Sequence, residues 1–102
     1  HVTDLAKAHI DAIKYIRNEK ENLIINLGTG RGTSVLEVIN QVKKISKKNI
    51  KYKIEDRRVG DLGVLIAKAS LAKKLINWEA FYSDSDTILR STWEMYKQKY
   101  GL

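Results

Sequence analysis

Three glycines alternate with other residues in Gly28–Gly32 (GTGRG), between an apolar run and a segment with helical periodicity. Dinucleotide-binding folds hold a pyrophosphate with a strand, a glycine-rich turn and a helix, at the spacing G-x-G-x-x-G. Here the third glycine comes one residue early, and Ser34 is placed to cap the helix itself. The G-K-[ST] end of a phosphate-binding P-loop is also absent. The spacing therefore favours a structural turn that needs glycine torsion angles over a cofactor site.

A second candidate for chemistry is the polar loop Arg57–Gly63 (RRVGDLG). The planar fork of an arginine binds two oxygens of a diphosphate at once, so Arg57 and Arg58 suit an anion site. Asp61 is a hydrogen-bond acceptor that suits the hydroxyl groups of a ribose. On the residue types alone, a solvated charged loop is the more common explanation for this stretch.

Length and composition indicate one compact domain or a part of a larger one, since the chain has 102 residues, 43% of them hydrophobic. The absence of cysteine excludes disulfides and thiolate metal sites, and we expect a cytoplasmic protein. No apolar run is long enough to cross a membrane, so no membrane partner is expected. His1 and His9 lack a second imidazole or carboxylate at metal-binding spacing, and we predict no metal site.

The net charge of +7 raises the question of a nucleic-acid partner, because six lysines fall in Lys43–Lys53 (KKISKKNIKYK). Ile50, Tyr52 and Ile54 have core-like spacing here, so the lysines are expected on the outer side of a helix end and a strand. The sequence has no zinc-finger spacing and no aromatic RNA-binding signature. A solvated face is therefore favoured over a nucleic-acid partner.

Apolar periodicity and turn residues predict the α/β class, as a small mixed unit in which helices pack on a few short strands. Ser34 and Glu37 form an S-x-x-E capping box at the start of one helix. The predicted elements are, in order, a helix capped by Thr3, a strand over 23–27, the helix capped by Ser34, a strand over 50–54, a short extended segment over 64–67, a helix from a Ser70 cap to Ile76, and a last helix capped by Asp84 or Asp86 and ended by Gly101.

Three blocks of sequence together resemble the last third of the UDP-glucose 4-epimerases, which are extended short-chain dehydrogenases/reductases. The blocks are His1–Ala6 (HVTDLA), Asn26–Gly30 (NLGTG) followed by Gly32, Ser34 and Val35, and Arg57–Asp61 (RRVGD). The resemblance runs from His1 to about Trp93, which is nearly the whole chain. This chain departs from the family at Gly63, where a proline is usual nearby, and at Ala67–Ala72 (AKASLA), where the family shows A-D-x-S-K-A.

The resemblance implies that residues 1–102 are a single C-terminal substrate-binding domain without the N-terminal Rossmann domain that binds NAD. In this family NAD takes a hydride from the sugar C4 and returns it to the other face, which interconverts UDP-glucose and UDP-galactose in galactose metabolism. The implied substrate-binding residues are Arg58 at the diphosphate, Asp61 at the ribose and Leu65 against the hexose. No tyrosine here meets the family's Y-x-x-x-K pattern, so we expect no catalytic residue and no activity from the chain alone.

The same resemblance implies three partners: a UDP-glucose or UDP-galactose substrate, the N-terminal domain of the same protein, and a second copy in a homodimeric parent. Another extended short-chain dehydrogenase acting on nucleotide sugars, such as a 4,6-dehydratase or a uronate epimerase, is the alternative within enzymes. The alternative from another class is a basic nucleic-acid-binding module.

Overall fold

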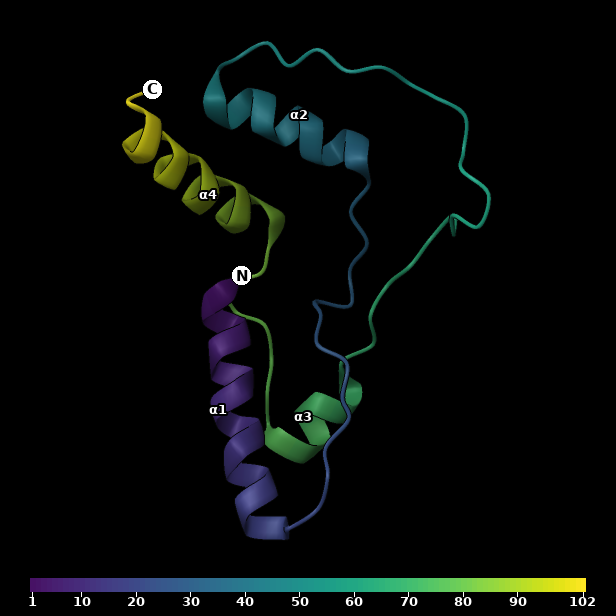
Figure 1. The fold of residues 1–102 in the computed structure, drawn as a ribbon, viewed down its shortest axis with the longest axis vertical. Coiled ribbons are helices and arrows are strands. Elements are labelled where there is room, and N and C mark those ends of the chain that lie inside the picture. Colours follow the sequence, from purple (N-terminus) through teal and green to yellow (C-terminus); the bar gives the residue numbers. More distant parts are fainter.

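The computed structural model describes all 102 residues and contains four helices and no strand (Figure 1). The helices are α1 (Val2–Glu19), α2 (Val35–Ser46), α3 (Ser70–Ile76) and α4 (Ser85–Tyr100). Because α1 packs on α3 and α2 packs on α4, the helices form two separate pairs. Residues 47–69, called the extended segment below, leave α2, sweep away from both pairs and return to α3 (Figure 1).

Local signals in the sequence account for the ends of α2 and α4. The predicted capping box of α2 is confirmed, because the Ser34 hydroxyl accepts from the Glu37 N–H and the Glu37 carboxylate accepts from the Ser34 N–H. α4 starts after Asp84, one of its two predicted caps, whose carboxylate accepts from the Thr87 N–H. α4 ends at Gly101 in the left-handed conformation, as predicted.

Two predicted caps are wrong by one or two residues. α1 begins after His1, whose ring nitrogen accepts from the Thr3 N–H, and Thr3 is therefore inside the helix. Ser70 is the first residue of α3, and Ala69 occupies the cap position without a side-chain hydrogen bond. Burial of Ala72 and Ile76 holds this short helix, since tertiary packing outweighs local signals in helices of this length.

The strands predicted over 23–27, 50–54 and 64–67 are absent, which corrects the expectation of helices packed on short strands. A strand requires a hydrogen-bonded neighbour, and 38 of the 47 backbone–backbone hydrogen bonds lie within the helices. The chain just after the first of these segments does lie against the last one, because a Cβ added to Gly28 would lie 2.7 Å from the Ala67 Cβ. They are neighbours without forming a ladder.

The buried core is small and lies between α1, α3 and the segment that follows α3. Ala8, Ala72, Ile76 and Trp78 are buried together there. The Trp78 indole N–H donates to the Asp4 backbone oxygen at 2.9 Å, which ties the segment after α3 to the start of α1. These four residues and Asp4 are called the Trp78 core below.

Most apolar side chains lie outside this core. On α1, Ile10 and Ile13 remain more than half exposed. The Cα radius of gyration is 17.3 Å, against about 13 Å for a compact domain of this size. The molecule is a plate whose shortest extent is 17 Å. No helix combines the length and the apolar composition that crossing a bilayer requires.

Candidate functional site

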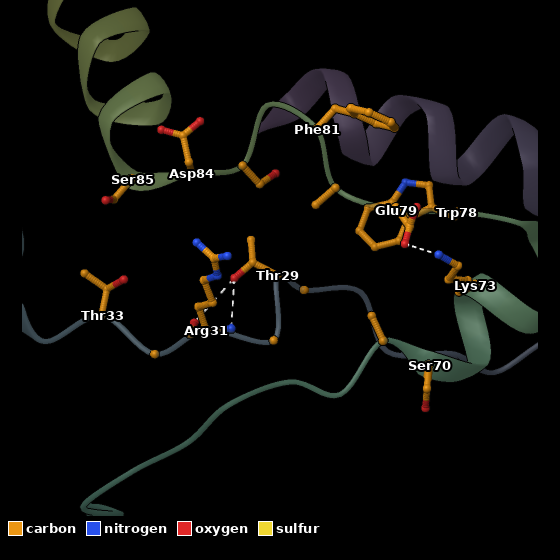
Figure 2. Close-up of a pocket in the computed structure, with 16 residues that line it drawn as sticks. Thr29, Arg31, Thr33, Ser70, Lys73, Trp78, Glu79, Phe81, Asp84 and Ser85 are labelled. Atoms are coloured by element: carbon orange, nitrogen blue, oxygen red, sulfur yellow. Dashed lines mark hydrogen bonds and ion pairs between the residues drawn. The ribbon is translucent and has the colours of Figure 1, made fainter.

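The glycine turn forms one wall of a cavity of about 740 Å³ (Figure 2). The start of α3 and the segment 78–85, which leads into α4, form the other walls. Gly30 has a φ of 71°, in the left-handed region that favours glycine, and Gly28 leaves no room for a side chain beside Ala67. The predicted need for a glycine torsion angle is confirmed at Gly30 alone, whereas Gly28 is needed for the close approach to Ala67.

The charged side chains around this cavity mostly have partners within the chain. Lys73 forms an ion pair with Glu79, drawn as a dashed line in Figure 2. Hydrogen bonds from the Thr87 side chain and backbone lower the pKa of Asp84. Arg31 has no ion-pair partner and extends into the space between the glycine turn and α4 (Figure 2). Because two cations face two carboxylates, the cavity lacks the excess positive charge that a pyrophosphate requires.

The start of α2 is already occupied by one of its own side chains. Glu37 Oε2 accepts from the Ser34 N–H at 2.6 Å and from the Ser34 hydroxyl at 2.7 Å. These two bonds, the backbone one first, lower the pKa of Glu37. A carboxylate at this end already supplies the negative charge that the helix dipole favours, and it would repel a phosphate there. The residues around the turn therefore do not fit a dinucleotide.

The three predicted substrate-binding residues line a second cavity, of about 710 Å³, within the extended segment. Arg58 Nε donates to Asp61 Oδ2 at 3.1 Å, and both side chains are exposed. Leu65 is 82% exposed, so it does not pack with Val64 and Ile66 in a strand. An exposed ion pair contributes at most about 1 kcal/mol, so a ligand replaces either partner at small cost.

This second cavity is not positively charged overall. Three carboxylates and two guanidinium groups line it: Glu55, Asp56, Asp61, Arg57 and Arg58. Asp61 neutralises Arg58, and the Arg57 guanidinium nitrogens lie 3.7 Å from where a Cβ would stand on Gly63. A tight diphosphate site here needs further cations from outside these residues.

Sequence reasoning gave Asp4 no role beyond its place in the His1–Ala6 block. Asp4 is only 4% exposed, and its Oδ2 accepts from the Ser83 hydroxyl at 2.6 Å and from the Tyr82 N–H at 2.8 Å. Burial by itself raises the pKa of Asp4, but these hydrogen bonds outweigh burial and lower that pKa overall. The contacts fix the segment 78–83 and with it one wall of the glycine-turn cavity.

The two histidines have local roles in α1. The His1 ring accepts the capping hydrogen bond from Thr3, and His9 Nδ1 lies 2.7 Å from the Leu5 backbone oxygen one turn earlier. No three His, Asp or Glu side chains come close enough together to hold a metal ion. Neither histidine lines either cavity.

Comparison with known proteins connects these features to one kind of enzyme, although no protein-family model matches the chain. The chain is 42% identical over 95 residues to a UDP-glucose 4-epimerase of Dictyostelium discoideum, which covers 92% of this chain and 27% of the relative. The crystal structure of the UDP-glucose 4-epimerase from Brucella ovis in complex with NAD has a TM-score of 0.82 and 40% identity, covering 88% of this chain and 28% of that one. The UDP-Glc/GlcNAc 4-epimerase from Campylobacter jejuni has a TM-score of 0.79 and 40% identity, covering 96% and 30%.

The chain spans less than a third of the length of these relatives. The relatives as a whole are α/β proteins, so the predicted class describes them, whereas the predicted short strands are absent from this chain. Sequence and fold together relate this chain to the UDP-glucose 4-epimerases, and it corresponds to their C-terminal part.

Proposed function

We propose that residues 1–102 form the C-terminal substrate-binding domain of an isomerase that interconverts UDP-glucose and UDP-galactose. The observation that carries this proposal is 42% identity to a UDP-glucose 4-epimerase over 92% of the chain. The TM-score of 0.82 to a solved epimerase supports it independently. The proposed reaction inverts the hexose at C4 through a transient 4-keto sugar.

We place the NAD for this reaction on an N-terminal domain of the same protein, where it supplies the redox chemistry when bound. The glycine turn does not fit NAD, because its third glycine comes early and Glu37 occupies the start of α2. The relative solved with NAD is covered by this chain over only 28% of its length, which leaves ample sequence for a separate domain. The task of this chain is then to bind and orient the nucleotide sugar.

Arg58 and Asp61 bind the diphosphate and the ribose in this proposal by exchanging partners. Each is now the partner of the other, at 3.1 Å. On binding, the Arg58 fork takes diphosphate oxygens, and Asp61 accepts hydrogen bonds from ribose hydroxyls. The exchange is favourable because the ion pair given up is exposed and contributes at most about 1 kcal/mol. Leu65, in the same cavity, takes the position against the hexose.

The N-terminal domain is also the proposed cover for the apolar surface of this chain. In the extended segment, Val59, Leu62, Val64 and Leu65 are all at least 70% exposed. Full burial of such a side chain stabilises by about 1.5–3 kcal/mol, so much of the available stabilisation is unused in the chain alone. The same domain is the proposed source of the cations that the Arg58 cavity needs.

We propose further that the parent enzyme is a homodimer, which sedimentation velocity tests.

The decisive experiment compares Arg58→Ala with Arg57→Ala in the complete polypeptide, by calorimetric titration with UDP-glucose. Arg58→Ala should weaken binding by about 1.5–3 kcal/mol, the range for a hydrogen bond to a charged group. Arg57→Ala should weaken it less, because that guanidinium lies over Gly63. Equal losses in both variants, or no loss in either, would contradict the role of Arg58.

A second experiment tests the domain assignment with residues 1–102 alone. With UDP-galactose and NAD, this chain should form no UDP-glucose above background in a coupled assay. The complete polypeptide is the positive control and should turn over. Turnover by a clean preparation of the 102-residue chain would show that it holds a cofactor site of its own.

A further inference from the structure

The positive charge of the chain is concentrated in one stretch, Lys43–Lys53. This stretch carries six lysines and no acidic residue. The other 91 residues carry 13 of the 19 basic side chains and all 12 acidic ones, so they hold a net charge of only +1 out of +7. The charge is therefore a local property of this stretch.

These lysines lie on the last turns of α2 and the start of the extended segment, on the side of the molecule away from α3 (Figure 1). The Lys43 ammonium lies 5.0 Å from the centre of the Tyr52 ring, which brings the helix end and the extended segment together. Only Lys53 has an ion-pair partner, Glu55 at 3.0 Å. The lysine face consists of Lys43, Lys44, Lys47, Lys48, Lys51 and Lys53.

Helix stabilisation does not account for this number of lysines. Cations in the last turn of a helix interact well with its dipole, which explains Lys43 and Lys44. Lys47, however, occupies the C-cap with a φ of 55°, a conformation that favours glycine. Lys48, Lys51 and Lys53 lie beyond the helix end, where the dipole effect fades.

The structure also removes the reason for assigning this run to a plain solvated face. That assignment required Tyr52 and Ile54 to point into a core, but Tyr52 is 48% exposed and Ile54 is 83% exposed. A half-exposed aromatic ring, with the Lys43 ammonium over one of its faces, thus stands between Lys51 and Lys53. Cations that track a phosphate backbone, next to a ring on which a base stacks, are the features of single-strand binding sites.

We propose that the lysine face binds single-stranded nucleic acid, with its ammonium groups on the phosphates and Tyr52 stacked on a base. None of its residues lines the Arg58 cavity, so this activity is separate from the proposed binding of a nucleotide sugar. An anionic membrane surface would contact the lysines but not the ring. The experiment must therefore distinguish binding to nucleic acid from binding to a membrane.

The experiment measures fluorescence anisotropy of a labelled single-stranded oligoadenylate of about 20 nucleotides, long enough to span one binding site, with the complete polypeptide. An adenylate oligomer is used because a uridylate oligomer could bind at the proposed UDP-sugar site. The lysine-face variant changes Lys43, Lys44, Lys47 and Lys48 to Gln. The matched control changes four unpaired lysines elsewhere, Lys14, Lys20, Lys68 and Lys74, to Gln. Both variants lose four charges, and both include a left-handed C-cap lysine, Lys47 or Lys20.

The lysine-face variant should bind oligoadenylate at least about tenfold more weakly, and its slope of log K against log salt should fall by about 3. The control should change affinity by less than about threefold, as long-range charge alone predicts. Tyr52→Ala should weaken binding by roughly tenfold. Epimerase turnover should be unchanged in both lysine variants, which keeps this test independent of the proposed function.

Three results would overturn the proposal. Equal losses in the lysine-face and control variants would mean that net charge alone attracts the nucleic acid. Displacement of oligoadenylate by UDP-glucose would place its binding in the Arg58 cavity. Binding to vesicles that contain phosphatidylserine, without binding to oligoadenylate, would identify the lysine face as a membrane contact.

Discussion

The Trp78 core and the extended segment both carry apolar residues at regular spacing, yet only the first buries them. In the core, Ala8, Ala72, Ile76 and Trp78 are at most 9% exposed, whereas Ile54 and Val59 in the extended segment are at least 83% exposed. α3 lies against α1 and supplies the opposing surface for the core. The contrast shows that an apolar pattern becomes a core only where the same chain provides the facing side.

The polar contacts of the two regions differ in the same way. The hydrogen bonds of Asp4 join residues 74 to 79 positions apart, to Trp78, Tyr82 and Ser83. The ion pairs of the extended segment, Lys53–Glu55 and Arg58–Asp61, join residues two or three positions apart. Long-range bonds fix the path of the chain, while short-range exposed pairs are free to exchange for a ligand. The first region therefore has the character of a scaffold and the second that of a binding surface.

The largest effect on stability is expected at Trp78, and its absence would contradict this contrast. In the complete polypeptide, Trp78→Ala should lower the free energy of unfolding by about 3–5 kcal/mol, because a buried aromatic ring is lost. Phe81→Ala is the matched control, since Phe81 is 77% exposed, and it should change stability by at most about 0.5 kcal/mol. Urea unfolding followed by circular dichroism measures both. Similar losses in the two variants would contradict the small core described here.

The next largest effect is expected at Asp4. Asp4→Ala should lower the free energy of unfolding by about 1.5–3 kcal/mol, because Ser83 and Tyr82 lose a charged acceptor. The folded-state pKa of Asp4 lies below its ordinary value of 3.8. Its contribution to stability is therefore present above that ordinary value and is lost as the pH falls through the folded-state pKa.

Asp4→Asn sharpens this test, because it keeps the shape and removes the titration. Its free energy of unfolding should lie below that of the unchanged protein at about pH 6, and the difference should shrink by about pH 3. Urea titrations at the two pH values measure it. A difference that stays constant would mean that the charge of Asp4 contributes nothing.

Within the extended segment, variants of Leu65 test whether this exposed side chain contacts the sugar of the substrate. Leu65→Tyr should abolish turnover of UDP-N-acetylhexosamines and spare UDP-glucose, because the ring leaves no room for the N-acetyl group. Leu65→Ser should raise turnover of the N-acetylated pair. The ratio of kcat/KM values should shift by about ten- to a hundredfold, as a pocket contact typically allows. If neither variant moves the ratio, Leu65 has no part in sugar choice.

The smallest effect is expected at Val64, and its size depends on the surroundings. In residues 1–102 alone, Val64→Ala should change the free energy of unfolding by less than about 0.5 kcal/mol, because Val64 is 78% exposed. In the complete polypeptide the same change should cost about 1 kcal/mol or more if a partner domain covers it. Thermal melts of both proteins make the comparison. If neither protein loses stability, no partner domain covers Val64.

The sequence allowed the helices to be predicted because their signals are local. The Ser34 capping box, the Asp84 cap and the Gly101 terminus all act within one turn. The alternation over 50–54 predicted a strand, but a strand also needs a neighbour, which this chain does not provide. Asp4 could not be recognised, because its partners lie at the far end of the chain.

In the candidate site, too, local features could be predicted from the sequence, while features that depend on side-chain positions could not. Arg58, Asp61 and Leu65 lie within eight positions of one another, so their proximity in one cavity follows from the chain itself. The pairing of Arg58 with Asp61, and the excess of carboxylates around them, depends on side-chain positions that spacing alone does not predict. Their roles toward a nucleotide sugar stay predictions until the variants are measured.

The plate shape of the molecule, 17 Å in its shortest extent, has a consequence for how the chain opens. A single helix with its side chains is about 10–12 Å across, so this plate holds fewer than two layers. Helices in so thin a layer lack protection on one broad side, and their amide hydrogens exchange with solvent whenever that side is uncovered. In a larger protein, exchange from α1 to α4 would therefore report how often the plate lifts off its neighbour.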